Sequence, residues 1–312
     1  MKIPYKHIVK YISSNPKICE LSEKLFQLGH EHEVIDDIFD FEFTPNRGDC
    51  LSLNGLLRDL RIFYDISYKK DIYKKNIEPL EIKFINNAKN FCKKISFLKI
   101  DVDQIPKKYE TTLEDYFKDL ENRKINFFTD ISNYISYETG QPTHCYDSSL
   151  IKGTIELKVL NKNAEFITLL NKKINVDLGD LVFSDSKEII NLAGIIGGKN
   201  TACTDNTKSV LIECAYFDPE IVLGRSIKYD LNSDAAHKFE RNTDFNCHDY
   251  ALRRFIKVVE SHTNIKKIQI FSKSYSENLN KEIPLNINKI QNILGFKLKA
   301  EECLKYLSNL EF

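Results

Sequence analysis

Two side chains in this sequence have types and settings that could act chemically on a bound substrate. His144 lies in the stretch GQPTHCYD, where a neutral imidazole can position a water molecule. Glu213 follows the apolar run 210–212, which predicts a carboxyl group at the end of a buried strand. A lone histidine is more often structural, and the alternative for Glu213 is a glutamate on the surface. Both alternatives stay open on these residues alone.

The cysteines and histidines do not form the patterns that bind metal or exchange disulfides. The eight cysteines are scattered without a paired short spacing, which zinc sites and redox motifs need. The seven histidines, including His30 with His32, show no ligand set that includes a carboxylate. We predict reduced, mostly buried thiols and no metal site, and we rank a metal-dependent hydrolase last among the candidate functions.

Length and charge restrict the class of protein further. The 312 residues exceed the size at which one hydrophobic core stops growing, so two or three folding units are expected. Lys plus Arg equals Asp plus Glu at 45 each, so no global field attracts nucleic acid or anionic membranes, and any such contact must be local. No stretch has the apolar run of a signal peptide or the ~20 apolar residues of a membrane span. We expect a cytoplasmic protein.

The elements that must position these side chains begin with a small N-terminal segment. Leu21, Leu25 and Leu28 have helical spacing, and Gly29 follows where helices commonly end. The alternation of phenylalanine with acidic residues over 39–43 predicts a half-buried strand. Further along, the sequence predicts a turn over 45–48, a second helix over 53–63 and a solvated charged linker over 67–76.

From about 91 to 272 the sequence changes to short strands separated by turns, which predicts one large mixed domain. Leu252, Phe255, Ile256 and Val259 give this domain an amphipathic helix near its end. The predicted strands include 98–104, 153–160, 180–186, 209–214 and 266–271. A polar boundary over 272–284 and two short helical patterns follow, too few residues to bury a core alone.

Five segments of the chain resemble the beta subunit of bacterial-type phenylalanyl-tRNA synthetases in their order and spacing. They are TPNRGDCLSLNG at 44–55, FFTDISNYISYETGQPTHCYD at 127–147, NLAGIIGG at 191–198, LIECAYFDPE at 211–220 and DAAHKFERNTD at 234–244. The resemblance covers most of the chain. In the last segment Lys238 and Asn242 replace the arginine and glycine of the family's RFERG-type run, so the local turn is expected to differ.

The resemblance implies an α+β, multi-domain fold. A mixed-sheet editing domain over 78–274 would be flanked by a small α/β N-terminal domain over 1–77 and by the start of a truncated small helical domain over 283–312. The family normally inserts a tRNA-binding oligonucleotide-fold domain before the TPNR-type strand, and this insert is missing here. The family also continues beyond position 312, so we expect either a fragment or a reduced subunit.

The resemblance also implies where an aminoacyl ester would be bound and cleaved. The family's editing domain hydrolyses tyrosine that has been mistakenly joined to phenylalanine tRNA. Glu213 matches the glutamate that receives the tyrosine hydroxyl, and a buried group left unpaired by phenylalanine can discriminate on the order of 10⁴. His144 matches the histidine near the scissile ester, and Ser132 is expected to act with them. Arg123 matches an arginine that helps to hold the tRNA end.

The remaining expected site residues bind the substrate. Ser132 with Asn133 matches a family Thr-Asn pair, and Ser233 with Ala235 matches a Thr-x-Ala stretch that lines the aromatic pocket. Both threonines are serine here, which removes a methyl group and loosens the pocket by up to ~1 kcal/mol of packing. Gly194 matches a glycine whose backbone approaches the substrate, because it has no side chain.

For the whole protein, the resemblance implies a subunit that supports phenylalanyl-tRNA synthesis and deacylates mischarged tyrosyl-tRNA(Phe). It implies a heterotetramer of two alpha and two beta subunits that binds tRNA(Phe). ATP and Mg²⁺ would serve the assembled ligase at a site on the alpha subunit, and none would be bound by this chain. Two alternatives stay open: a scaffold subunit that no longer edits, and a freestanding aminoacyl-tRNA hydrolase without a ligase partner.

Overall fold

A computed structural model describes residues 1–68, 71–277 and 282–311 of the chain. By the contacts between residues it divides into two units. The first comprises Met1–Phe43, Leu53–Lys69 and Glu277–Phe312, and the second comprises Thr44–Ser52 and Lys70–Ser276. The three predicted domains, 1–77, 78–274 and 283–312, have other limits, because the first unit combines segments from both ends of the chain. Parts of the charged linker predicted over 67–76 and of the boundary predicted over 272–284 lie outside the described residues.

The first unit contains a small antiparallel sheet and several helices. Its strands are β1 (Lys2–Pro4), β2 (Glu31–Ile35) and β3 (Ile38–Glu42), in the order β1-β3-β2. Its helices are α1 (Tyr5–Val9), α2 (Ile18–Gln27), α3 (Leu53–Leu60), α10 (Ile287–Leu294) and α11 (Ala300–Asn309). The predicted strand is confirmed, because Phe39 and Phe41 are buried on one face of β3. The first helix is confirmed as well: Leu21 and Leu25 are buried, and Gly29 follows with φ +81°.

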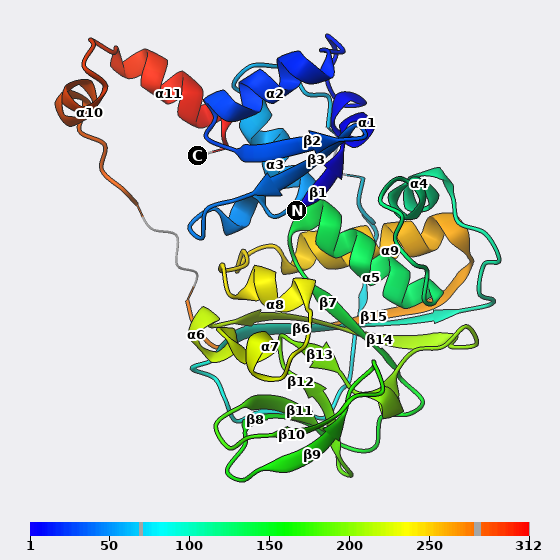
Figure 1. Ribbon diagram of the computed structural model, residues 1–312. Coiled ribbons are helices and arrows are strands. Elements are labelled where there is room, and N and C mark those ends of the chain that lie inside the picture. Colours follow the sequence, from blue (N-terminus) through cyan, green and yellow to red (C-terminus); the bar gives the residue numbers. More distant parts are fainter. Residues whose placement is uncertain (69–70, 278–281, 312) are drawn as a thin grey trace. The chain divides into compact units, whose positions relative to one another are not determined.

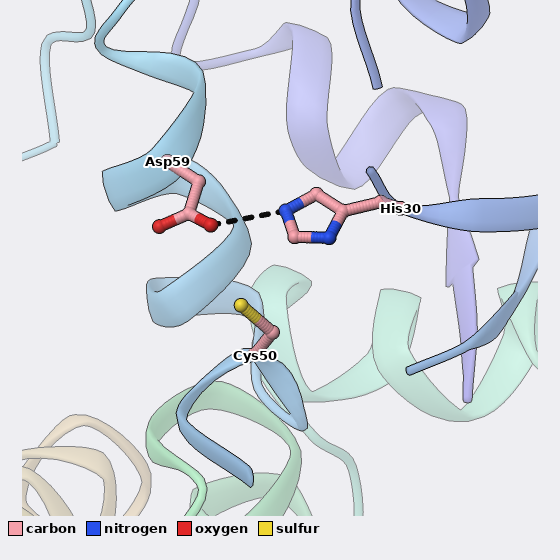
Figure 2. A group of neighbouring side chains, drawn as sticks. All are labelled: His30, Cys50 and Asp59. Carbon is pink, nitrogen blue, oxygen red and sulfur yellow. Dashed lines mark hydrogen bonds and ion pairs between the residues drawn. The ribbon is translucent and has the colours of Figure 1, made fainter. Parts of the chain in front are cut away.

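A buried polar pair joins the residue before β2 to α3 within this unit. Nε2 of His30 lies 3.0 Å from Oδ2 of Asp59, and Figure 2 shows the two side chains pointing toward each other. Arg58 donates to the other carboxylate oxygen, Oδ1, at 2.8 Å. A buried carboxylate requires such partners. These contacts therefore stabilise the first unit.

The second unit is built on two five-stranded sheets and a hairpin (Figure 1). The strands of one sheet are, in order, β4 (Glu78–Pro79), β15 (Ile265–Ser274), β6 (Cys92–Val102), β14 (Ser209–Phe217) and β7 (Thr143–Asp147). Those of the other are β13 (Ile196–Gly197), β12 (Ile189–Leu192), β11 (Leu181–Ser184), β8 (Ile155–Val159) and β5 (Phe84–Asn86). The hairpin pairs β9 (Ala164–Ile167) with β10 (Lys173–Val176). The strands predicted in this part of the sequence are confirmed.

Helices α5 (Phe127–Thr139) and α9 (His248–His262) lie on one face of the sheet that contains β14, and the second sheet lies on the other (Figure 1). The other helices of this unit are α4 (Thr111–Asp119), α6 (Pro219–Val222), α7 (Arg225–Lys228) and α8 (Asp234–Phe239), with short 3-10 turns at Gly48–Cys50 and Lys199–Thr201. On the face toward the second sheet, Phe97, Leu211 and Phe217 pack with Leu157 and Phe183 of that sheet in one apolar core.

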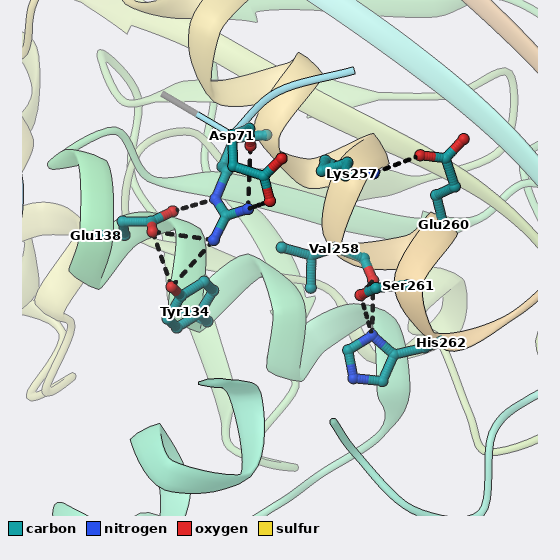
Figure 3. Close-up of polar contacts among 9 residues, drawn as sticks. Asp71, Tyr134, Glu138, Lys257, Val258, Glu260, Ser261 and His262 are labelled. Carbon is teal, nitrogen blue, oxygen red and sulfur yellow. Dashed lines mark hydrogen bonds and ion pairs between the residues drawn. The ribbon is translucent and has the colours of Figure 1, made fainter. Parts of the chain in front are cut away.

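A buried ion pair fixes α5 to α9. Arg254 donates from Nε to Oε2 of Glu138 at 2.7 Å and from Nη2 to Oε1 at 3.1 Å. The hydroxyl of Tyr134 donates to the same Oε1 at 2.8 Å, and Arg254 also donates from Nη1 to Oδ2 of Asp71 at 3.3 Å. Figure 3 shows Glu138, Tyr134 and Asp71 grouped around these contacts. The Glu138 side chain is only 1% exposed, so this charge is buried together with its counter-charge.

The segment with the altered family run forms a turn that asparagine can adopt. Asn242 has φ +69°, a left-handed conformation that asparagine tolerates better than most residues other than glycine. Its side-chain oxygen accepts a hydrogen bond from Tyr216 at 2.8 Å. Nearby, a Cβ atom on Gly48 would lie 2.2 Å from the carbonyl oxygen of Arg241. This close approach explains why the turn 44–52 groups with the second unit.

The predicted α+β class, with several mixed sheets, is confirmed. Each of the eight cysteines is a thiol outside any disulfide, and five of them are buried, as predicted. Among the described residues, none of the helices has both the length and the apolar character needed to cross a bilayer.

Candidate functional site

His144 and Glu213 are direct neighbours across two antiparallel strands. His144 lies on β7 and Glu213 lies opposite it on β14, so both side chains project from the same face of the sheet. This face is turned toward the second sheet. The predicted placement of Glu213 at a strand end is wrong, because the apolar run continues past it from Cys214 to Phe217 and keeps the strand buried. Glu213 is therefore in the middle of β14.

The Glu213 carboxyl group is held by neutral donors from both sheets. The hydroxyl of Tyr146, on β7, donates to Oε2 at 2.6 Å. The side-chain amide of Asn191, on β12, donates to the same Oε2 at 3.1 Å and to the Tyr146 hydroxyl oxygen at 3.0 Å. Tyr146 is 0% exposed, and Asn191 and Glu213 are each 4% exposed. The three side chains thus form a closed triangle of hydrogen bonds between the sheets.

Burial controls the protonation of this triangle. It raises the pKa of Glu213 to about 7, while the hydrogen bonds from Tyr146 and Asn191 act in the opposite direction. Burial also raises the pKa of Tyr146 well above its ordinary value, with the Glu213 charge adding to the effect. Tyr146 is therefore a neutral donor at every physiological pH. Glu213 changes charge near neutrality, which is typical of groups at functional sites.

His144 is positioned by close packing. Its ring meets the Tyr146 ring edge to face, with 4.4 Å between centroids. On its other side it lies against Gly197 of β13, where a Cβ atom would be 2.0 Å from Cε1 of the imidazole. The side chain is partly exposed, but its Nε2 atom is buried without a hydrogen-bond partner. Burial lowers the pKa of His144 to about 4, so the imidazole is neutral at pH 7 and can accept a proton or a hydrogen bond.

The Ser132 hydroxyl is used within the protein. Ser132 is buried on α5 and donates to the carbonyl oxygen of Thr143 at 2.6 Å, with the Thr143 hydroxyl 2.8 Å away. It therefore anchors the residue next to His144. Asn133 is exposed on the same helix, and Arg123 is exposed in the irregular segment before it. Of these three residues, only Ser132 contacts the strand that bears His144.

Gly194, Ser233 and Ala235 gather around the start of α8. Gly194 follows β12 with φ +73° and is packed so tightly that an added Cβ would lie 3.1 Å from both Phe217 and Val222. Ser233 caps α8 by accepting from the amide of Ala236 and donates to the carbonyl oxygen of Ile195 at 2.7 Å. Ala235, in the first turn of α8, is partly buried.

A short segment connects these residues to the His144 group. Residues 194–197 run from the contact with Ser233 to the contact between Gly197 and His144. Lys238 adds a second connection, because its buried Nζ donates to the carbonyl oxygen of Ser136 on α5 at 2.5 Å. Burial lowers the pKa of Lys238 to about 8. His144 and Glu213 thus lie where β7, β14 and β13 meet, and α5 and α8 are connected to these strands through the hydrogen bonds of Ser132 and Ser233.

Sequence reasoning did not single out Tyr146, Asn191 or Gly197 as site residues. Tyr146 is two positions from His144, and the alternation of a strand places both on one face. This two-residue alternation is the feature of the sequence from which Tyr146 could have been predicted. Asn191 opens the segment NLAGIIGG, but its contact with Glu213 depends on the packing of two sheets. Among the described residues, no cluster of three metal-binding side chains includes His144 or Glu213.

Comparisons with known proteins find relatives for most of the chain, and a family model matches part of the second unit. Residues 98–264 match the model of the B3/4 domain family. The chain is 30% identical over 286 residues to the phenylalanine–tRNA ligase beta subunit of Psychrobacter arcticus, covering 89% of this chain and 35% of the relative. It is 28% identical over 281 residues to that of Francisella tularensis, covering 88% and 35%. The chain thus spans about a third of the length of these relatives.

A solved structure also aligns with the whole chain. It is an N-terminal fragment of the phenylalanyl-tRNA synthetase beta subunit from Pyrococcus horikoshii, with a TM-score of 0.48 and 14% sequence identity. The alignment covers 100% of this chain and 89% of that structure.

Proposed function

The chain belongs to the B3/4 domain family and is homologous to about a third of the phenylalanine–tRNA ligase beta subunit, and from this premise we propose that it is an editing subunit. Its second unit hydrolyses the ester of tyrosine mistakenly joined to tRNA(Phe). The chain supports phenylalanyl-tRNA synthesis as the partner of an alpha subunit, in a heterotetramer of two alpha and two beta subunits.

The proposed reaction is the hydrolysis of an aminoacyl ester. The oxygen of a water molecule adds to the carbonyl carbon, the bond from that carbon to the ribose oxygen breaks, and the proton that the water gives up ends on the ribose oxygen, which leaves a free amino acid and the 3′-terminal hydroxyl. A neutral His144 can accept a hydrogen bond from the attacking water through Nε2, which has no partner within the protein. With a pKa of about 4, His144 is a weak base at pH 7, so its main contribution is to orient the water.

One observation supports this proposal most strongly: His144 and Glu213 occupy directly paired positions on one face of one sheet. Cβ atoms in such a pair are about 5 Å apart, so a single aminoacyl group can reach both. His144 then serves the ester, which all substrates share. Glu213 serves the side chain, because a buried carboxyl group discriminates a ring with a hydroxyl from a ring without one.

The test is a deacylation assay with the chain and its alpha subunit, using tyrosyl-tRNA(Phe) and phenylalanyl-tRNA(Phe). We expect hydrolysis of the tyrosyl ester to fall about 10²-fold in His144→Ala. Glu213→Ala should reduce the preference for tyrosine. The matched control is His262→Ala, because His262 lies at the end of α9 and bonds to the backbone amide of Glu110. A wild-type assembly that leaves tyrosyl-tRNA(Phe) intact would refute the editing function.

The division of labour between subunits is tested separately. In our proposal ATP and Mg²⁺ act at the alpha subunit, where phenylalanine is adenylated, and this chain contributes assembly and tRNA editing. We therefore expect no phenylalanine-dependent pyrophosphate exchange by the isolated chain and full exchange after addition of the alpha subunit. Exchange by the isolated chain would contradict the assignment.

A second candidate function, a scaffold subunit without editing, is favoured by a specific observation. Glu213 and Ser132 both already have partners within the protein, in Tyr146 with Asn191 and in Thr143. A subunit that binds the alpha subunit in a pull-down, restores aminoacylation and hydrolyses no aminoacyl ester would be a scaffold. A chain that hydrolyses esters but does not bind an alpha subunit would instead be a freestanding hydrolase.

A further inference from the structure

The hydrogen bonds around Glu213 engage one of its two oxygens. Tyr146 and Asn191 both donate to Oε2, and neither contact involves Oε1. The two donors come from different sheets, since Tyr146 lies on β7 and Asn191 on β12. A carboxylate has about four lone-pair positions over its two oxygens. The triangle therefore fixes the orientation of the carboxyl group and leaves Oε1 as the acceptor for a ligand.

The molecule itself shows which kind of donor this carboxyl group accepts. The Tyr146 hydroxyl, a phenol, lies 2.6 Å from Oε2, a distance typical of a strong hydrogen bond to a charged acceptor. A second phenol that enters beside His144 has the same chemistry. Without the triangle, the Glu213 side chain would be free to change rotamer, and the cost of fixing it would reduce the gain from binding.

We propose that Tyr146 is a specificity-determining positioning residue: together with Asn191 it holds Oε2 of Glu213 so that Oε1 accepts the phenolic hydroxyl of the substrate's amino acid. This deepens the editing proposal and rests on it, because it assigns the selectivity for tyrosyl over phenylalanyl esters to a triangle of three side chains. The phenylalanyl ester leaves Oε1 desolvated and unpaired, and this penalty is what separates the two esters.

The triangle also governs the charge of Glu213. The hydrogen bonds from Tyr146 and Asn191 lower the pKa of Glu213 against the effect of burial. The other titratable groups that interact with this carboxyl group are the thiols of Cys92, Cys145 and Cys214, whose pKa values are raised so that they are neutral. His144, on the adjacent position of β7, is neutral as well. Loss of the Tyr146 hydroxyl therefore raises the pKa of Glu213 and converts Oε1 from an acceptor into a protonated oxygen at neutral pH.

The experiment compares wild type with Tyr146→Phe in the complete assembly. Two analogues are used in which an amide replaces the ester, tyrosyl and phenylalanyl 3′-amino-3′-deoxyadenosine, and their dissociation constants are measured by calorimetry from pH 6 to 9. We expect Tyr146→Phe to reduce the preference for the tyrosyl analogue about tenfold at pH 7, equivalent to one hydrogen bond to a charged group. The preference should recover partly at pH 9, where Glu213 ionises.

A matched control removes the same chemical group elsewhere. Tyr134→Phe deletes a hydroxyl that also donates to a buried glutamate, Glu138, and it should leave the preference unchanged. A ¹³C NMR titration of the Glu213 carboxyl carbon should show a higher pKa in Tyr146→Phe than in wild type, without any ligand present.

The outcomes separate the two proposals. A preference that rises in Tyr146→Phe means that Tyr146 competes with the substrate for Glu213, and an unchanged preference means that Tyr146 only supports the core; either result overturns the inference. Absence of binding of both analogues also overturns it. If the preference falls as expected but the wild-type assembly hydrolyses no ester, the triangle selects tyrosyl groups and the editing function fails.

Discussion

The second unit buries two glutamates, each beside a tyrosine hydroxyl, but their charges are balanced in different ways. Glu138, on α5, receives two hydrogen bonds from Arg254 and one from Tyr134. Glu213, on β14, receives hydrogen bonds from the neutral groups of Tyr146 and Asn191. One carboxylate is thus neutralised by a cation on the helical face of the sheet, while the other has no cation among these contacts on the opposite face.

The difference shows how one unit uses the same residue for two purposes. A buried carboxylate with a guanidinium partner is fixed in its charged state and contributes to structure. A buried carboxyl group held by neutral donors has a pKa of about 7, so it responds to pH and to a ligand. We therefore assign Glu138 to the attachment of α5 to α9 and Glu213 to recognition.

The largest effect on stability is expected when the ion pair between Glu138 and Arg254 is broken. Glu138→Gln leaves the guanidinium of Arg254, whose side chain is 11% exposed, buried without its main counter-charge. We expect the free energy of unfolding to fall by about 3 to 5 kcal/mol, measured by urea denaturation. Unfolding at the wild-type midpoint would contradict the structural role of this pair.

Two controls sharpen this result. Glu138→Leu combined with Arg254→Met removes both charges and should restore most of the lost stability, because an apolar pair needs no desolvation of charge. Asp249→Asn breaks the pair between Arg253 and Asp249, which spans four residues on α9 and has an Asp249 side chain that is 70% exposed. This change should alter the free energy of unfolding by less than about 0.5 kcal/mol.

Glu213 should instead make the free energy of unfolding depend on pH. Its pKa is about 7 in the folded protein and 4.5 in the ordinary state, so the folded state binds the proton more tightly. The stability that this proton contributes is complete below about pH 4.5 and is lost as pH rises through 7. We expect the free energy of unfolding of wild type, minus that of Glu213→Gln, to fall by up to roughly 3 kcal/mol as pH rises across this interval.

His144 provides the opposite sign in the same experiment. Its pKa is lowered to about 4 from 6.5, so the unfolded state binds the proton more tightly and stability is lost as pH falls through this range. The difference between wild type and His144→Ala should therefore grow with rising pH from 4 to 6.5. If the stability difference between wild type and Glu213→Gln does not vary with pH, Glu213 has a fixed charge state, as we assign to Glu138.

Apart from the exposed control pair, the smallest effect is expected from the packing of Gly197 on His144. In Gly197→Ala the new methyl carbon would lie 2.0 Å from Cε1 and 2.5 Å from Nε2 of the imidazole, so the ring must move. We expect a loss of roughly 1 to 3 kcal/mol in the free energy of unfolding. In a double-mutant cycle, His144→Ala should relieve most of this loss. Strictly additive effects would show that the two residues are not in contact.

Local patterns were enough to predict most elements, whereas the site residues were predicted from the resemblance of five segments to a known family. The spacing of Leu21 and Leu25 predicted α2, and the alternation over 39–43 predicted β3, because burial of one face of an element leaves its period in the sequence. The same approach failed for Glu213. A single carboxylate in an apolar run was interpreted as the end of a strand, whereas neutral donors from a second sheet allow it to lie in the middle.

The sequence by itself determined the order of strands and helices through periodicity, and through the resemblance of five segments to a known family it determined the fold class and the candidates His144 and Glu213. Only the tertiary structure decided which side chains meet. Tyr146 and Asn191 lie 67 and 22 positions from Glu213 along the chain, and they reach it through the register of β7 on β14 and the packing of one sheet on another. Register and packing are set by the burial of whole faces, which no local pattern encodes.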